Sequence, residues 1–255
     1  MTEIEKILSE FAPISLAEMD SVKLMNRIDT KYVVPLEQLS SILEKAKEEY
    51  FAQEINTKRI ATYDTMYYDT EDLDMYIRHH DRQLVRQKIR IREYVDSHLN
   101  FLEIKRKNNK GRTKKKRIPL EQPNIANVSD EIKDFIAAKS RYTYNEISPK
   151  LRTAFHRITL VNKAKTERLT IDLDLVFENQ VTSIRKTYPT LVIVELKRDG
   201  DVPSPMLSIM RSERVKPFKV SKYCIGTALT TPMTKINRFK KKIRIIEKKL
   251  DIINQ

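Results

Sequence analysis

Eight segments of the chain alternate polar and apolar residues with the two-residue period of a β-strand. They are 27–34, 62–68, 84–95, 99–107, 113–120, 155–162, 168–177 and 190–197. Turn-forming residues flank these segments, and the Asn-Asn-Lys-Gly sequence at 108–111 is typical of a hairpin loop. No internal repeat or low-complexity linker divides the chain. The pattern predicts one β-rich domain.

Other segments carry apolar residues at steps of three and four, which predicts helices. They are 1–26, 35–43, 129–139, 203–210, 221–229 and 235–253. The last is the most regular, because Ile236, Phe239, Ile243, Ile246 and Leu250 recur along one face. We expect a domain over 1–232 and an amphipathic helix within 233–255 that packs on its outside. A dimer contact or a membrane surface are the alternatives for this helix.

The polar positions of the strands are mostly charged. In 86–92 every even position is cationic, and in 168–175 every even position is polar or charged. Because successive side chains on a strand point to opposite faces, each strand has one apolar face and one charged face. An open sheet with a solvated charged face would explain this pattern. A barrel with its charged faces turned inward and helices on its apolar outside is the other interpretation.

An inward arrangement would bring twelve cations and five anions together. The cations are Arg27, Lys31, Arg86, Lys88, Arg90, Arg92, Lys105, Lys107, Lys115, Arg117, Arg168 and Lys197. The anions are Asp29, Glu103, Asp172, Asp174 and Glu195. Like charges in restricted solvent repel strongly, so this interior predicts a polyanionic ligand such as a triphosphate or polyphosphate. Arginine suits phosphate contacts, and the carboxylates could hold a divalent metal.

The amino-acid composition agrees with a phosphate-rich ligand and argues against a glycine-rich nucleotide loop, a disulfide framework and a zinc site. Lys and Arg number 49 and Asp and Glu 35, a formal net charge of +14. With 3 glycines the chain has no glycine-rich phosphate loop. The single cysteine, Cys224, excludes a disulfide framework and is expected to be a small buried residue. The four histidines show no zinc pattern and are expected in surface or packing roles. We expect a cytoplasmic protein without a signal peptide or membrane span.

Several short motifs occur together in one order along residues 20–230. They are 23–32 (KLMNRIDTKY), 67–70 (YYDT), 88–92 (KIRIR), 101–105 (FLEIK), 152–155 (RTAF), 194–197 (VELK) and 219–223 (KVSKY). In these motifs the chain resembles the VTC (vacuolar transporter chaperone) polyphosphate polymerase domain, of the triphosphate tunnel metalloenzyme or CYTH-like superfamily. The resemblance implies an α+β fold, an eight-stranded antiparallel β-barrel that forms a triphosphate tunnel, with flanking helices.

The resemblance also implies a function. The chain would be a metal-dependent ATP:polyphosphate phosphotransferase of the polyphosphate kinase type, moving the γ-phosphate of ATP onto a polyphosphate chain. The cofactor would be Mn²⁺ or Mg²⁺. ATP and polyphosphate would be the ligands, with no specific nucleic acid. The C-terminal helix could contact a second copy or a membrane-protein partner.

The resemblance further assigns residues to roles. The catalytic residues that grip phosphates would be Arg90, Arg92, Lys105, Arg152, Arg168 and Lys197. The other ligand-binding residues would be Arg27, Lys31, Lys88, Arg117, Lys219, Ser221 and Lys222. Ser221 would act at a helix N-terminus, which is itself an anion site. Glu195 would hold the metal, with Glu103 as a helper.

One departure from the superfamily pattern bears on the reaction. Hydrolytic tunnel enzymes carry Glu-x-Glu-x-Lys on the first strand, whereas this chain has Arg27-x-Asp29-x-Lys31. The loss of one acid weakens a second metal site and disfavours simple hydrolysis. Three alternatives stay open: a tunnel triphosphatase or polyphosphatase, a noncatalytic polyphosphate- or nucleotide-binding module, and an RNA-binding open basic sheet.

Overall fold

The computed structural model describes residues 2–20, 22, 27–126 and 128–251. Its main element is an antiparallel sheet with eight strands in the order β2-β11-β9-β8-β4-β5-β6-β7. These strands are β2 (Arg27–Pro35), β4 (Ala61–Asp69), β5 (Arg86–Tyr94), β6 (Leu99–Lys107), β7 (Thr113–Leu120), β8 (Ser148–Asn162), β9 (Glu167–Asn179) and β11 (Leu191–Asp199). The short strands β1 (Ala12–Ile14), β3 (Tyr50–Gln53) and β10 (Arg185–Tyr188) pair beside this path. All eight predicted strands are confirmed.

The sheet curves into a barrel that hydrogen bonds do not close. β2 and β7 are the two ends of the strand path, and no pairing joins them within the described residues. The free side of β2 is met by the segment before α7, where the Phe218 amide donates to the Lys31 carbonyl oxygen at 2.6 Å. The predicted α+β class, with an eight-stranded antiparallel tunnel and flanking helices, is confirmed.

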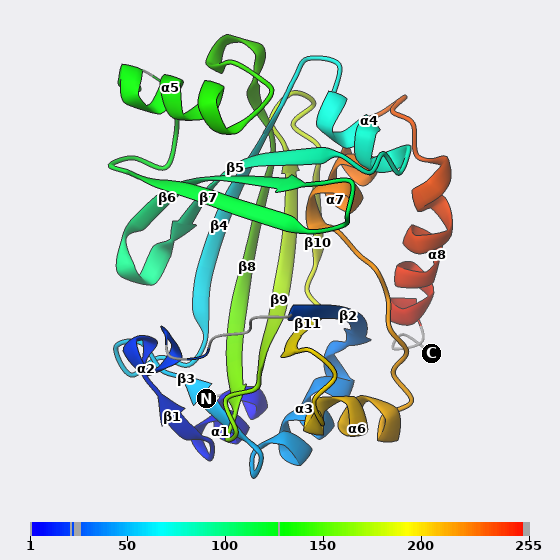
Figure 1. The fold of residues 1–255 in the computed structure, drawn as a ribbon. Helices are drawn as coiled ribbons and strands as arrows, with labels where there is room; N and C mark the ends of the chain where they lie inside the picture. Colours follow the sequence, from blue (N-terminus) through cyan, green and yellow to red (C-terminus); the bar gives the residue numbers. More distant parts are fainter. Residues whose placement is uncertain (1, 21, 23–26, 127, 252–255) are drawn as a thin grey trace.

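The helices lie around this sheet (Figure 1). They are α1 (Glu3–Ser9), α2 (Leu16–Asp20), α3 (Leu36–Ala46), α4 (Asp74–His80), α5 (Asp130–Lys139), α6 (Pro205–Ser212), α7 (Lys222–Thr230) and α8 (Asn237–Asp251), with two 3₁₀ turns at Val95–Ser97 and Tyr144–Glu146. The single helix predicted over 1–26 is wrong, because α1 ends at Ser9 and an extended segment with Pro13 follows it. Residues 1, 21 and 23–26 of that prediction lie outside the described residues. Helix α4 and the strands β1, β3 and β10 were not predicted.

Two apolar clusters cover the outer face of the barrel. Leu39 of α3 and Met210 of α6 belong to a buried cluster with Val192 of β11. Ile132 of α5 belongs to another with Ile104 of β6. The strand positions in both clusters are the apolar halves of the alternating pattern, so burial of these halves turns the charged halves inward.

One region of the inner face is apolar, and helix α7 covers it. Leu151, Phe155 and Phe177 point inward and pack in one cluster with α7. A Cβ atom on Gly226 of α7 would lie 2.6 Å from a Phe177 ring carbon, so only glycine permits this close approach. Sequence analysis placed the helices outside the barrel, and for α7 this is wrong. Inward-facing apolar side chains need a cover of their own, which α7 provides.

Helix α8 joins the same cluster. Phe239 and Ile246 are buried with the inward-facing cluster, and the rings of Phe239 and Tyr76 lie 5.7 Å apart. The Lys242 ammonium donates to the Lys219 carbonyl oxygen at 2.7 Å. The apolar face of α8 is therefore occupied by the chain itself, against α7 and α4 rather than on the outer face of the sheet.

Candidate functional site

The register between neighbouring strands brings charged side chains together on the inner surface of the barrel. Lys88 lies opposite Lys105, and Arg90 lies opposite Glu103. On the other wall, Glu195 lies opposite both Lys31 and Thr170. Residues directly opposite each other share a face of the sheet, so these side chains line a single surface.

Arg90 and Glu103 form a buried ion pair on this surface. The Arg90 Nε and Nη2 atoms donate to Glu103 Oε2 at 2.8 and 2.6 Å, and Lys115 Nζ donates to Oε1 at 3.0 Å. Burial favours the neutral acid, but the charges of Arg90, Arg92 and Lys115 prevail and hold the pKa of Glu103 well below its usual range. Glu103 is therefore ionised and fully engaged by two cations.

A second buried cluster joins β8, β9 and α7. Arg157 donates to the two oxygens of Asp172 at 2.6 and 2.9 Å, and the Lys222 ammonium donates to Asp172 Oδ2. Burial lowers the pKa of Lys222 to about 8. Sequence analysis missed Arg157. The sequence did carry a signal for it. Arg157 shares the phase of Phe155 and Thr159 along the strand, and the apolar Ile158 and Leu160 have the opposite phase.

Arg152 is not part of this surface. It lies opposite Met66 on β4, whereas Tyr67 lies opposite Arg90, so Arg152 is on the outer face. There it donates to Asp64 at 2.7 Å and to Glu178 at 3.0 Å. Arg152 and Arg157 are an odd number of positions apart on one strand, so only one of them can point inward. The assignment of Arg152 to the phosphates is corrected on this ground.

Asp174 was also predicted inside, and it is exposed outside. The register of β8 with β9 shifts near this residue, and Asp174 has a positive φ of 51°. One extra residue in β9 reverses the alternation, as a β-bulge does. Asp174 therefore contacts His156 at 2.9 Å on the outer side, and Leu175 and Phe177 take the inward positions.

Arg92 and Lys105 are inner basic side chains without a carboxylate partner among the described residues. The Arg92 Nε is buried and has no hydrogen-bond acceptor, and its guanidinium lies 5.4 Å from the centre of the Tyr63 ring. The charge of Arg90 and burial lower the pKa of Lys105 to about 5. Burial and the nearby Arg27 lower the pKa of Arg168 as well. An anion placed among these groups would relieve their mutual repulsion.

The start of α7 brings further predicted residues to the same surface. Ser221 caps the helix, and its hydroxyl accepts a hydrogen bond from Lys88 Nζ at 2.8 Å. Tyr223, the next residue after Lys222, donates to the buried Asp69 at the end of β4. Asp69 also accepts the backbone amides of Met75 and Tyr76 at 2.9 Å. Asp69 therefore fixes α4 and α7 together, and with them the positions of Ser221 and Lys222.

The remaining predicted residues lie nearer the solvent. Arg27 is exposed and pairs with Asp29 at 2.6 Å. Arg117 is exposed, with its guanidinium 4.4 Å from the centre of the Phe101 ring. The Lys219 side chain is exposed. Their contact with a ligand stays a prediction.

Glu195 is the strongest candidate for a metal ligand. Lys197 Nζ lies 2.8 Å from one of its oxygens and Lys31 Nζ lies 3.8 Å from the other. Burial favours the neutral acid, yet these lysines hold the pKa of Glu195 well below its usual range. No group of three acidic, histidine or cysteine side chains that could hold a metal occurs within the described residues. Glu195 could therefore give one ligand to a divalent ion whose other ligands are phosphate oxygens and water.

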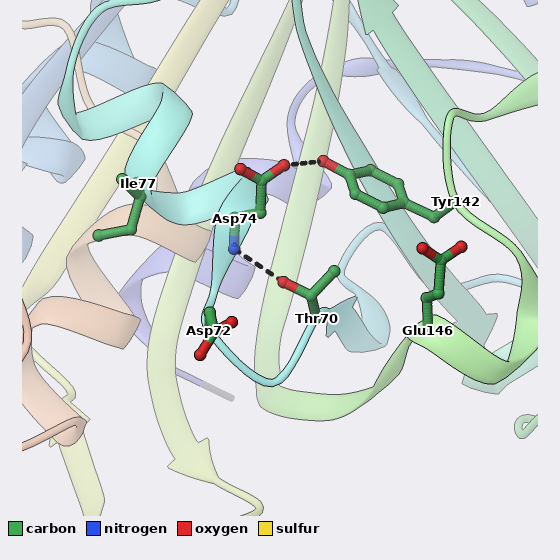
Figure 2. Close-up of a pocket in the computed structure, with 6 residues that line it drawn as sticks. All are labelled: Thr70, Asp72, Asp74, Ile77, Tyr142 and Glu146. Carbon is green, nitrogen blue, oxygen red and sulfur yellow. Dashed lines mark hydrogen bonds between the residues drawn. The ribbon is translucent and has the colours of Figure 1, made fainter.

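A surface pocket elsewhere has the wrong charge for phosphate. It measures about 430 Å³ and is lined by Thr70, Asp72, Asp74, Ile77, Tyr142 and Glu146. Figure 2 shows Tyr142 donating to Asp74, at 2.5 Å, and the Asp74 amide donating to Thr70, at 2.9 Å. Three carboxylates line this pocket, so the basic inner surface is the better candidate for a polyanion.

Cys224 and the histidines near it have packing roles. Cys224 is buried, as predicted, and its sulfur lies 3.0 Å from His79 Nδ1. Burial and the charge of Lys88 lower the pKa of His79 to about 2. His80 is buried, and its Nε2 atom accepts the Arg238 amide at 3.2 Å. These contacts tie α4 to α7 and α8.

Comparisons with known proteins agree with the sequence motifs. The sequence profile of the VTC domain family matches residues 26–231. None of the curated proteins matches the chain at a significant level. Among solved structures, a conserved hypothetical protein from Pyrococcus furiosus is 10% identical, with 78% of this chain and 99% of that chain covered and a TM-score of 0.42.

A second similar structure is a Hippeastrum protein, named as a candidate adenylyl cyclase that has a dominant triphosphatase activity. It is 12% identical, covers 81% of this chain and 98% of its own, and has a TM-score of 0.45. Within the part of the chain that the structure describes, no helix is both long and apolar enough to cross a membrane.

Proposed function

The chain belongs to the VTC domain family, and from this premise we propose that it transfers the γ-phosphate of ATP to the end of a polyphosphate chain. The observation that carries the proposal is a pair of basic side chains beside Arg90, the buried Arg92 and the half-buried Lys105, which have no carboxylate partner among the described residues. Basic side chains that lack hydrogen-bond acceptors are stabilised most by a ligand that carries several negative charges.

The proposed reaction breaks one P–O bond and forms another. The terminal oxygen of the polyphosphate chain attacks the γ-phosphorus, and the bond to the bridging oxygen of ADP breaks with its electron pair leaving on ADP. The attacking oxygen is already anionic, so no general base is required. Catalysis then consists of aligning the two phosphate groups and stabilising charge on the transferred one.

The residues of the inner surface divide this work between them. Arg90, Arg92 and Lys105 would hold the triphosphate from β5 and β6, and Arg168 would extend this contact on β9. Lys31, Lys197 and Lys222 would line the path of the polyphosphate chain on the opposite wall and at the start of α7. Arg157 is added to this set by its place beside Lys222.

A divalent metal would be held by Glu195 and would neutralise part of the phosphate charge. Glu103 is a weaker metal candidate, because Arg90 and Lys115 donate hydrogen bonds to both of its oxygens, whereas Lys31 stays 3.8 Å from the second oxygen of Glu195. Its role here is to orient Arg90, whose position depends on this ion pair.

Partners beyond the substrates would have to use other surfaces. The apolar face of α8 is buried against the domain, so a homodimer or a membrane-protein partner would meet the exposed basic side of α8. We also propose a cytoplasmic location, because the cysteine is free and the proposed substrate is a nucleotide.

Incubation with ATP and Mn²⁺ or Mg²⁺ tests the proposal, with a gel that resolves polyphosphate and a parallel assay of free phosphate. We expect long chains from the unaltered protein and none from Glu195→Gln. Asp174→Asn, which removes an exposed carboxylate on the outer face, is the matched control and should retain activity. Free phosphate without chains would instead make the protein a tunnel triphosphatase. Binding of phosphates without either product would make it a noncatalytic module.

A further inference from the structure

The β6–β7 hairpin carries cations on both of its faces, and only the inner ones belong to the site described above. On the outer face lie Arg106, Lys114 and Lys116, all exposed. Arg106 and Lys114 lie directly opposite each other in the register. Like charges in this arrangement destabilise a sheet. None of the three has an ion pair or hydrogen bond from its side chain among the described residues, so the fold itself gains nothing from them.

These cations occupy the part of the outer face that no helix covers. Leu102 and Ile118, nearer the other end of the hairpin, pack in the cluster with Ile132 of α5. In Figure 1, α5 lies beyond that end, and the tip of the hairpin extends away from it. The outer face is thus divided into an apolar half under α5 and a basic half toward the tip.

The basic half is continuous with the inner surface around the tip. Lys105 and Lys115 face inward on the same two strands, one position away from Arg106 and Lys114. The loop between them exposes Lys110 and Arg112. An anionic chain that leaves the inner surface at this tip would meet cations at every step from the inner face to the outer face.

We propose that the outer face of the β6–β7 hairpin, at Arg106, Lys114 and Lys116, binds the part of a long polyphosphate chain that has left the tunnel. This inference rests on the proposed function and extends it to a second binding surface. Phe101 is the one aromatic residue of β6 and β7, and it points inward beneath Arg117, so neither strand places an aromatic side chain beside these cations. Single-stranded nucleic acid is held by stacking on aromatic side chains as well as by charge, so a chain of phosphates without bases fits this surface better.

The experiment compares two ligands on two variants of the full chain. Long-chain polyphosphate can reach both surfaces, whereas tripolyphosphate fits within the inner one. The test variant combines Arg106→Gln, Lys114→Gln and Lys116→Gln. The matched control combines Lys240→Gln, Lys241→Gln and Lys248→Gln, which removes three exposed cations from α8. Binding is measured directly by calorimetry or fluorescence over a range of salt concentrations.

We expect the hairpin variant to lose about tenfold or more in affinity for long-chain polyphosphate, and its logarithmic salt slope to fall by about two, as for loss of three contacts to a flexible polyanion. Its affinity for tripolyphosphate should stay within about twofold, because the inner cations are intact. The α8 control should bind both ligands as the unaltered protein does. The unfolding midpoint of the hairpin variant should not fall, because the charges of Arg106 and Lys114 that it removes repel each other across the two strands.

Three results would overturn the proposal: a parallel loss of tripolyphosphate affinity, an equal loss in the α8 control, or a larger loss for single-stranded RNA than for polyphosphate. The last would assign the surface to nucleic acid. These readouts need no turnover. A protein that makes no chains from ATP but shows the selective loss would contradict the proposed function and leave the second surface supported.

Discussion

Arg157 on β8 and Asp172 on β9 form a two-point ion pair inside the barrel, with N–O distances of 2.6 and 2.9 Å. The same carboxylate accepts a hydrogen bond from Lys222 at the start of α7. One buried anion therefore fixes a cation from the sheet and a cation from the helix that covers it. This cluster links the stability of the fold to the position of two proposed phosphate ligands.

Asp172→Asn should destabilise the protein strongly. Arg157 would keep its charge without the carboxylate that pairs with it, and Lys222 would lose the anion that holds its proton. Removal of one partner of such a buried ion pair typically costs about 3–5 kcal/mol of unfolding free energy. Urea unfolding measures this loss. Asp174→Asn, only two residues away but exposed, should change it by about 0.5 kcal/mol or less. Equal effects of the two substitutions would contradict the role given to Asp172.

Tripolyphosphate should restore part of the stability that Asp172→Asn removes. A ligand that binds only the folded state stabilises it in proportion to the logarithm of its concentration over its dissociation constant. The variant lacks the anion beside Arg157 and Lys222, so it should bind the ligand more tightly and gain more stability at the same ligand concentration than the unaltered protein. A smaller gain in the variant would show that the inner cations do not bind phosphate.

Arg92→Gln separates binding from folding. Arg92 has no carboxylate partner among the described residues, so the variant should unfold at the same urea concentration or a higher one. Its affinity for tripolyphosphate should fall by about tenfold to a hundredfold, since one charge-assisted hydrogen bond contributes about 1.5–3 kcal/mol. Calorimetric titration measures the affinity.

Arg152→Gln is the control for this prediction. Its guanidinium lies on the outer face with Asp64 and Glu178, so tripolyphosphate affinity should be unchanged. If Arg152→Gln weakened binding as much as Arg92→Gln, the assignment of the two arginines to opposite faces would be wrong.

Lys105 should couple the binding of tripolyphosphate to the uptake of a proton. In the free protein the charge of Arg90 and burial lower the pKa of Lys105 to about 5, so this amine is neutral at pH 7. A bound polyanion raises that pKa, and binding at pH 7 should take up about one proton. Titrations in two buffers with different ionisation enthalpies count the protons. Lys105→Arg, which stays charged, should bind tripolyphosphate without this uptake.

The same shift sets the sign of one contribution to stability. The unfolded chain holds the Lys105 proton up to its ordinary pKa of 10.5, whereas the folded protein releases it near 5. Between these values the unfolded state binds more protons, so the contribution of Lys105 to stability rises with pH. Lys105→Met should therefore show a flatter rise of unfolding free energy above pH 5 than the unaltered protein.

Phe239→Ala tests whether α8 is part of the domain. Phe239 is 6% exposed and packs on Tyr76 and His80. Loss of a buried phenylalanine typically costs about 3–5 kcal/mol. Lys240→Ala on the exposed side of the same helix should cost about 0.5 kcal/mol or less, by urea unfolding. A helix that docks on a partner rather than on this domain would show no difference between the two.

Local alternation was enough to predict which side chains of most strands share a face. Arg90, Arg92 and Lys105 were placed together correctly because their strands pair without interruption. Two residues were misplaced, for different reasons. Asp174 lies at a bulge, which reverses the alternation and has no signal of its own in the residue pattern. Arg152 was placed inside by its motif, although alternation already set it opposite in phase to Arg157.

The sequence by itself therefore determined the α+β class, eight strands, the basic surface and the family, since alternation and motifs are local properties of the chain. Only the tertiary structure decided which charges neutralise each other, because Arg157 and Asp172, or Arg90 and Glu103, meet through register between strands. It also decided that α7 covers an inner apolar region formed by Leu151, Phe155 and Phe177. Phe177 lies on a different strand from Leu151 and Phe155, and burial of their combined surface requires the curved sheet together with the helix that covers it.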